Sequence, residues 1–520
     1  MIQPVFPIDP EILDFARRAE ERAAPAFAAI EENEQFNGMK VLKAFIDNGI
    51  SAAHLCGSTG YGYGDIGRDA LDRVFAQALG AKDALVRHGF VSGTHALTVG
   101  LFGLLRPGDV LLSLTGEPYD TLEEVIGIRD NGRNEGSLRD FGVRYAQVEL
   151  VDGKIDLRAA AEAAKGAKVA YIQRSRGYSL RPSLSVDEIG EAAKAVKRAN
   201  PAVIVMVDNC YGEFVERAEP VAVGADLMVG SLIKNPGGGI ARTGGYLAGR
   251  HDVIERCACR LTTPGTGREV GCALDELRSM YMGLFMAPTT VAAALKTAVF
   301  AAALFEGMGF ETFPKANDAR HDIIQAIALK TSGALVAFCE GIQSGSPIDS
   351  MAVPEPWDMP GYDSQVIMAA GAFTLGASIE LSADAPMREP FAVWLQGGLT
   401  YPTGKAGILL AADRLHKKQR ARDGAYTALR RCPTGLRKVD PLPDLSSRVG
   451  TFSPCYLLVA AVAAKEFCPL PFMAQLWYNN CKATIIRFYV QGGPLVQPAP
   501  VSIRYYTRLM SNGPPLNGAT

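Results

Sequence analysis

Short apolar runs alternate with amphipathic segments between about residues 84 and 250. The apolar runs predict strands at Ala84–Arg87, Val110–Leu114, Arg144–Val148, Val169–Gln173, Val203–Val207, Leu227–Val229 and Gly244–Ala248. The amphipathic segments predict helices at Thr94–Leu105, Thr121–Asp130, Leu157–Ala164 and Val186–Ala199. Alternation of this spacing predicts an α/β fold with a mostly parallel central sheet that helices cover on both faces.

The flanking segments predict further parts of the chain. Residues 9–48 are expected to form a helix, and Pro288–Phe305 another, which leads into a smaller α+β unit. That unit has predicted strands at Ala334–Phe338, Ser378–Leu381 and Phe391–Leu395. We therefore divide the chain into an N-terminal helical arm (1–60), a large domain (61–306), a small C-terminal domain (307–418) and a basic, proline-rich extension (419–520) that we expect to be poorly ordered.

Composition excludes several classes of protein. The 520 residues are 48% hydrophobic and 21% charged, and the net charge is -2, which gives no reason to expect nucleic acid or a membrane as a partner. No secretory signal is visible at the N-terminus, and the ten cysteines are scattered, so we expect reduced thiols and a cytoplasmic protein. Cys257 and Cys259 have no second pair nearby, so no metal site is expected.

Two residues carry the clearest chemical signal. Lys234 lies in a glycine-rich turn, GSLIKNPGGG at 230–239, and Asp208 follows a buried apolar run at 202–207. Pyridoxal phosphate needs a lysine that holds it as a Schiff base and an acid that keeps its pyridine nitrogen protonated. Each residue alone has an ordinary interpretation, a surface lysine and a turn-forming Asp-Asn pair. The apolar flanks of Lys234 also predict an amine whose pKa falls.

A phosphate site is expected beside these residues. Ser92, Gly93 and Thr94 follow a predicted strand and open a helix, where free backbone N–H groups suit a phosphate. Ser231 can add a hydroxyl from the other side. A plain helix cap is the alternative for Gly93 and Thr94, and it is the better interpretation when this motif is taken alone.

Two further residues are candidates for binding the ring and the substrate. Tyr119, just after a predicted strand, can stack on the pyridine ring and shuttle a proton, although packing is its commoner role. Arg388, beside a strand of the small domain, can bind an α-carboxylate through its guanidinium. A surface ion pair of Arg388 with Glu389 or Asp384 is somewhat better supported by the sequence alone.

The segment GYGDIG at 62–67 matches the glycine pattern of dinucleotide-binding loops. The residues before this segment form a poor strand. The dinucleotide-binding pattern also needs an acid at the end of the next strand, whereas Asp83 lies before that strand. We therefore set a nicotinamide cofactor aside.

Taken together, these motifs resemble those of the methionine gamma-lyase family, whose bacterial members are often called aluminium resistance proteins, within the cystathionine-metabolism group of fold-type I pyridoxal-phosphate enzymes. The likeness lies in residues 60–69, 92–96, 207–213, 230–239 and 380–384, and it extends over about residues 10–418. The resemblance implies Lys234 as the Schiff-base lysine, Asp208 as the pyridinium partner and Tyr119 as the stacking ring. It also implies Gly93, Thr94 and Ser231 as phosphate ligands.

The family resemblance further implies that Tyr63 reaches the phosphate of a neighbouring subunit, in a homodimer or homotetramer. It implies carbon–sulfur bond cleavage in a sulfur amino acid such as methionine or a cystathionine-like thioether, through a Schiff base and a carbanion. Transamination or aldol cleavage is the first alternative. A weakly catalytic, cofactor-binding metal-tolerance protein is the second.

Overall fold

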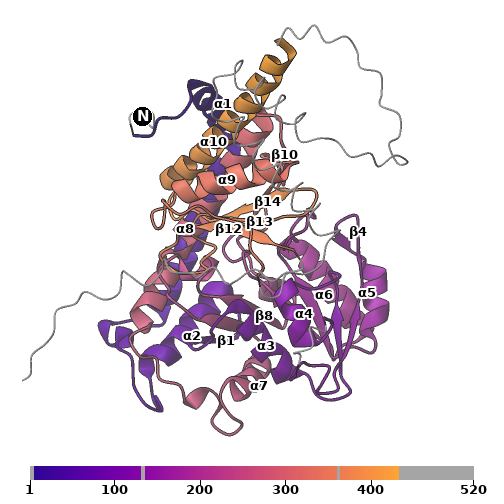
Figure 1. The fold of residues 1–520 in the computed structure, drawn as a ribbon. Helices are drawn as coiled ribbons and strands as arrows, with labels where there is room; N and C mark the ends of the chain where they lie inside the picture. The colour runs from indigo at the N-terminus through magenta and orange to yellow at the C-terminus, as the bar shows by residue number, and fades with distance from the viewer. Residues whose placement is uncertain (1–4, 130–134, 360–363, 432–520) are drawn as a thin grey trace, which may run out of the picture. The chain divides into compact units, whose positions relative to one another are not determined.

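The computed structural model describes residues 5–129, 135–359 and 364–431, with side chains up to residue 421. Its large domain is built on a seven-stranded sheet of strand order β1-β9-β8-β7-β6-β2-β3 (Figure 1). The strands are β1 (Asp83–Arg87), β2 (Val110–Ser113), β3 (Arg144–Gln147), β6 (Val169–Gln173), β7 (Ile204–Asp208), β8 (Leu227–Ser231) and β9 (Gly245–Gly249). Only β9 runs antiparallel to its neighbours, so the predicted, mostly parallel sheet is confirmed.

Helices cover both faces of this sheet, as predicted. One face packs against α3 (Gly93–Leu104), α4 (Asp120–Ile126) and α7 (His251–Leu261). The other packs against α2 (Ile66–Leu79), α5 (Leu157–Ala164) and α6 (Val186–Ala199). Burial on both faces explains why the central strands are continuous apolar runs, with every residue of β6 and β7 buried. A small hairpin, β4 (Leu150–Val151) and β5 (Lys154–Ile155), lies apart from the sheet.

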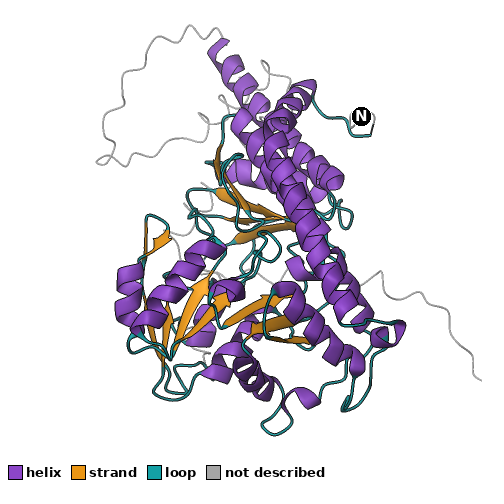
Figure 2. Ribbon diagram, turned by 180° about the vertical axis from the view of Figure 1, so that it is seen from behind, coloured by secondary structure: helices purple, strands orange, loops and turns teal. Residues whose placement is uncertain are grey.

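Two long helices connect the two domains. In α1 (Pro10–Asp47), Ile12, Ala16 and Ala19 join the core of the small domain, whereas Val41 and Ala44 join that of the large domain. The helix α8 (Leu277–Gly307) is likewise shared (Figure 2). It is long and apolar enough to cross a bilayer by length and composition, but 72% of its most apolar window is buried inside the protein, as in a core helix.

The predicted start of α8 at Pro288 is wrong. The helix begins at Leu277 and continues through Pro288, which lies inside it. Proline is common in the first turn of a helix, and for this reason the sequence suggested that the helix starts at Pro288. In the described part of the chain, four short 3-10 helices connect other elements, at Ala52–Leu55, Pro220–Val223, Asn235–Gly237 and Gly267–Glu269.

The small domain is a five-stranded antiparallel sheet with one helix packed against it and a second helix packed against the first. The strand order is β10-β11-β14-β13-β12, formed by Glu311–Phe313, Gln325–Ala328, Ala392–Gln396, Ser382–Pro386 and Val366–Ala370, and the helices are α9 (Ser332–Ser344) and α10 (Tyr401–Arg431). The predicted strand Ala334–Phe338 is wrong, because it lies within α9, which Thr331 caps by accepting a hydrogen bond from the Ala334 N–H at 3.2 Å.

Two other small-domain predictions differ from the structure. Ser378–Leu381 is not a strand, because β13 begins only at Ser382. The predicted boundary after residue 418 falls inside α10, which continues to Arg431. Residues 432–520 of the predicted extension lie outside the described residues.

Candidate active site

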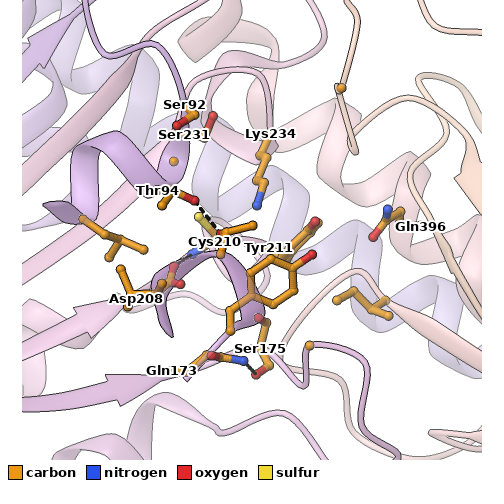
Figure 3. Close-up of a pocket in the computed structure, with 18 of the residues that line it drawn as sticks. Ser92, Thr94, Gln173, Ser175, Asp208, Cys210, Tyr211, Ser231, Lys234 and Gln396 are labelled. Carbon is orange, nitrogen blue, oxygen red and sulfur yellow. Dashed lines mark hydrogen bonds between the residues drawn. The ribbon is translucent and has the colours of Figure 1, made fainter. Parts of the chain in front are cut away.

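A pocket of about 230 Å³ lies at the carboxyl ends of the central strands, where the sequence predicted a site (Figure 3). Residues from the small domain, among them Asp384 and Gln396, complete its wall. It brings together six of the residues singled out from the sequence: Gly93, Thr94, Tyr119, Asp208, Ser231 and Lys234. Parallel strands direct their carboxyl ends to one edge of the sheet, which explains why residues so distant in sequence meet here.

Lys234 follows β8 on a turn that only glycine permits. A Cβ at Gly237 would lie 1.6 Å from the backbone oxygen of Leu232. Gly238 has a φ of 56° and would place a Cβ 2.4 Å from the backbone oxygen of Gly283 in α8. The turn therefore packs closely against α8. It holds the half-buried Lys234 with its Nζ 4.1 Å from the centre of the Tyr211 ring.

The charge on Lys234 differs from the expectation. Burial acts to lower the pKa of its amine, but Cys210, Tyr211 and Asp208 act in the opposite direction, and the pKa is raised overall. The predicted fall in pKa is therefore wrong for the protein without a ligand. The apolar residues beside Lys234 were visible in the sequence. Asp208 and Tyr211, which favour the protonated amine, come from the end of β7 and the loop after it.

Asp208 ends β7 and is buried. Its Oδ1 accepts a hydrogen bond from the Cys210 N–H at 3.0 Å, and the Tyr171 hydroxyl lies 3.5 Å from Oδ2. Burial raises the pKa of Asp208, and the nearby Lys234 partly offsets this rise. A carboxylate at such a place is stabilised by a cationic partner, and the protonated ring nitrogen of a pyridine is one.

The first turn of α3 and Ser231 form one side of the pocket. Ser92 caps α3, since its Oγ accepts a hydrogen bond from the His95 N–H at 3.0 Å. A Cβ at Gly93 would lie 3.4 Å from the Ser231 Cβ, so the two segments are in close contact. The Oγ of Ser231 is buried, and within the described part of the chain it has no hydrogen-bond partner. Such a hydroxyl beside a helix N-terminus suits an anion such as phosphate.

Tyr119 directly precedes α4 and lies at the junction with a second pocket. Its ring centre is 6.0 Å from that of Tyr178, with the planes inclined by 60°. The structure thus places Tyr119 in the pocket wall, and its stacking role stays a prediction.

Two predicted residues lie outside the central pocket. Tyr63 is 66% exposed, with its ring centre 5.8 Å from that of Tyr61, and its contact with a neighbouring subunit stays a prediction. Arg388 is exposed and lines the second pocket, of about 460 Å³. Among the described residues, no arginine lines the central pocket.

Sequence reasoning missed several residues of the pocket. Tyr211 lies under Lys234 and accepts a hydrogen bond from the Ser378 Oγ at 3.2 Å. Asp384, on β13, accepts one from the Gln396 Nε2 at 3.1 Å, and burial raises its pKa to about 6. Tyr211 and Asp384 both occur in the motifs at 207–213 and 380–384, which offered a signal, but no role was assigned to them.

A buried network behind the pocket ties the Asp208 loop to the Lys234 turn. The Asn235 Nδ2 donates a hydrogen bond to the backbone oxygen of Glu213 at 3.0 Å, and the Tyr246 hydroxyl donates one to the Glu213 Oε1 at 2.8 Å. The fully buried Arg174 donates to the Asn209 Oδ1 at 2.8 Å and to the Gly212 oxygen at 3.0 Å. These contacts fix the loop that carries Asp208 and Tyr211 relative to Lys234.

Comparisons with known proteins agree with this arrangement. A family model described as Methionine gamma-lyase matches residues 12–416, which include the whole pocket. The protein YnbB of Bacillus subtilis (strain 168) is 51% identical over 406 residues, which are 78% of this chain and 96% of that protein. The solved structure of a carbon-sulfur lyase involved in aluminum resistance from Clostridium novyi NT is 49% identical with a TM-score of 0.77, covering 80% of this chain and 98% of that one.

A more distant structure shares the fold alone. The pyridoxal-5'-phosphate dependent protein YhfS from Escherichia coli has a TM-score of 0.51 at 17% identity, covering 75% of this chain and 97% of that one. These likenesses confirm the predicted fold class, the α/β fold of fold-type I pyridoxal-phosphate enzymes.

Proposed function

The chain belongs to the methionine gamma-lyase family, and on this premise we propose that it is a pyridoxal-phosphate-dependent carbon–sulfur lyase acting on a sulfur amino acid. The observation that carries the proposal is the convergence of Lys234, Asp208 and Ser231 on one pocket. Each offers what one part of the cofactor needs: an amine for its aldehyde, an acid for its ring nitrogen and a hydroxyl for its phosphate.

The fit to the phosphate rests on Ser231. Its buried Oγ lacks a partner among the described residues, and Gly93 and Thr94 supply backbone N–H groups from the first turn of α3. An unpaired buried hydroxyl costs about 1–3 kcal/mol, which a phosphate oxygen would recover. The Oγ1 of Thr94 lies 2.7 Å from the Oγ1 of Thr121, and this hydrogen bond fixes the direction of the Thr94 hydroxyl.

The bound cofactor would act as an electron sink for a carbanion at Cα of the substrate. Asp208 would keep the ring nitrogen protonated, and the hydrogen bond that it accepts from the Cys210 N–H favours the carboxylate form that this role needs. The Nζ of Lys234, when it is free, would accept the proton from Cα of the substrate. Lys234 or Tyr119 would then return a proton to the departing sulfur.

The small domain would close the site over the substrate. Asp384, Trp394 and Gln396 line the pocket opposite the strand ends and limit the access of water. A homodimer or homotetramer and a cytoplasmic location remain predictions of the sequence, and so does the role of Tyr63.

Product analysis tests this function. The purified chain with pyridoxal phosphate is incubated separately with L-methionine, S-ethyl-L-cysteine and L-cystathionine, and free thiol and keto acid are measured. We expect equal amounts of both products from at least one substrate, with none from Lys234→Ala. Lys194→Ala, which removes an exposed lysine of α6, is the matched control. Keto acid without thiol would indicate transamination. Glycine released from L-threonine, which has the β-hydroxyl that aldol cleavage needs, with no thiol from any of the three thioethers, would indicate aldol cleavage; either result would contradict the proposal.

A further inference from the structure

Asp384 is an acid of the central pocket to which the proposed function gives no chemical role. It lies on β13, where the other four residues are buried and Asp384 is partly exposed. Asp384 lines the pocket, so the exposed part of its side chain faces the cavity. A ligand in the pocket can therefore reach its carboxyl group.

The carboxyl group of Asp384 is held by uncharged hydrogen-bond donors. Its Oδ2 accepts a hydrogen bond from the Gln396 Nε2 at 3.1 Å, and Tyr178 supplies another side-chain hydrogen bond. Burial raises the pKa of Asp384 to about 6, and both hydrogen bonds and the charge of Lys234 act against this rise. At neutral pH the group is mostly ionised, and its two neutral donors orient it without balancing its charge.

The pocket holds more acidic than basic side chains. Among the described residues that line it, Asp208 and Asp384 carry the carboxyl groups, and Lys234 is the one lysine or arginine. In the proposed function Asp208 pairs with the ring nitrogen of the cofactor, and Lys234 holds its aldehyde. Asp384 is then a negative charge without an assigned cation in a largely buried wall, and a cationic group of a ligand would stabilise it.

This charge lies beside the reacting end of the pocket. Burial raises the pKa of Tyr211, Lys234 acts against that rise and Asp384 adds to it, so both charges act on the same phenol. In Figure 3, Gln396, which holds Asp384, lies across the pocket from Lys234 and Tyr211. The pocket measures only about 230 Å³, so an amino acid whose amino group approaches Lys234 also lies close to Asp384.

We propose that Asp384 receives the α-ammonium group of the incoming amino acid and so selects ligands that carry a free amino group. Its carboxylate replaces water around the ammonium, and Gln396 and Tyr178 keep the carboxylate in place. The inference rests on the proposed function, because it takes the reacting amino group to approach at Lys234. A residue that only supported the pocket wall would affect ligands with and without an amino group alike.

Calorimetric titration with a matched pair of ligands tests the inference. The chain is loaded with pyridoxal phosphate and reduced with borohydride, so that the cofactor stays fixed and no turnover occurs. L-Methionine and γ-(methylthio)butyrate, which differ only in the amino group, are titrated into the wild type, Asp384→Asn and Asp187→Asn. The last variant changes an exposed aspartate of α6 outside the pocket and is the control.

We expect the wild type to bind L-methionine at least about tenfold more tightly than γ-(methylthio)butyrate, as a charge-assisted hydrogen bond predicts. Asp384→Asn should lower this ratio of affinities roughly tenfold, and Asp187→Asn should leave it unchanged. The ligand carboxylate is common to both compounds, so the ratio reports on the amino group. Unchanged binding of γ-(methylthio)butyrate would also show that the pocket of Asp384→Asn is intact.

An equal loss of affinity for both ligands in Asp384→Asn would overturn the inference. So would a wild-type ratio near one, which needs no substitution and decides the matter even if Asp384→Asn does not fold. If the ratios behave as expected but the unreduced wild type releases no thiol from any thioether, the proposed lyase function alone fails. If borohydride fixes no cofactor to the chain, both proposals fail.

Discussion

The Nζ of Lys234 lies over the face of the Tyr211 ring, 4.1 Å from its centre. A cation in this position is attracted by the ring, by roughly 0.5–2 kcal/mol. Tyr211 also has a φ of 73°, an uncommon conformation for a residue with a side chain. The loop after β7 therefore holds a strained residue directly beneath the lysine, which indicates that the ring helps to position the amine.

Two substitutions at Tyr211 separate its ring from its hydroxyl. Tyr211→Phe keeps the ring over which the lysine lies and loses the hydrogen bond from Ser378, so we expect kcat/KM to change by less than about threefold. Tyr211→Ala removes the ring, and we expect a loss of roughly tenfold or more. Neither phenylalanine nor alanine relieves the strain of the positive φ at position 211, so the two variants share this strain and differ only in the ring. Equal activities of the two variants would contradict a role for the ring.

Asp208→Asn removes the negative charge that would face the cofactor ring. We expect kcat to fall roughly 100-fold or more, because a preorganised charge at a reacting centre contributes about 2.7–4 kcal/mol. Cofactor retention, measured by absorbance after gel filtration, should persist, since Lys234 and Ser231 are unchanged. A kcat within threefold of the wild type would refute the assignment of Asp208.

Substitutions of Ser231 and Ser92 are expected to affect the stability of the cofactor-free protein differently. Ser231→Ala removes a buried hydroxyl without a partner among the described residues, so the free energy of unfolding should stay the same or rise, by at most about 3 kcal/mol. Ser92→Ala removes the cap of α3 and should cost about 1 kcal/mol. With pyridoxal phosphate added, Ser231→Ala should weaken its binding roughly tenfold. An unchanged affinity would argue against Ser231 as a phosphate ligand.

Glu213 predicts a stability change with pH. Burial raises its pKa to about 8, above the ordinary value of 4.5. The folded protein thus keeps a proton that the unfolded chain releases, and this contribution to stability is full below pH 4.5 and is lost as the pH rises through 8. Glu213→Gln stays uncharged, so the difference in Tm, variant minus wild type, should grow between pH 5 and pH 8.5.

An exposed glutamate provides the comparison for this titration. Glu162→Gln, on α5, should show a Tm difference that does not grow over the same range. If Glu213→Gln behaved in the same way as Glu162→Gln, the carboxyl of Glu213 would not be the group that titrates.

The large domain could be predicted because its sheet is buried on both faces. The strands Val169–Gln173 and Ile204–Asp208 are buried along their whole length and are apolar except for their last residues, and the predicted and observed bounds agree to within one residue. The same burial placed Asp208 at a strand end and brought it near Lys234. Local sequence was sufficient there because the order of parallel strands sends their carboxyl ends to one edge.

The small domain could not be predicted equally well. Residues 334–338 are apolar, and a short apolar run does not distinguish a strand from a buried helix turn. Thr331 at the start of α9 was the missed signal. Asp384 and Gln396 enter the pocket because β13 and β14 pair side by side, and that pairing depends on contacts distant in sequence. The predicted fall in the pKa of Lys234 failed for a similar reason, since Asp208 and Tyr211 lie on another segment.

The central claim is that Lys234 holds pyridoxal phosphate covalently, and reduction with borohydride tests it most directly. The absorption spectrum of the purified chain is recorded with added pyridoxal phosphate, before and after reduction, and the modified peptide is identified by mass spectrometry. We predict a band near the visible edge that disappears on reduction, with the adduct on Lys234 and none in Lys234→Ala. A chain that gains no band, or an adduct on another lysine, would contradict the account.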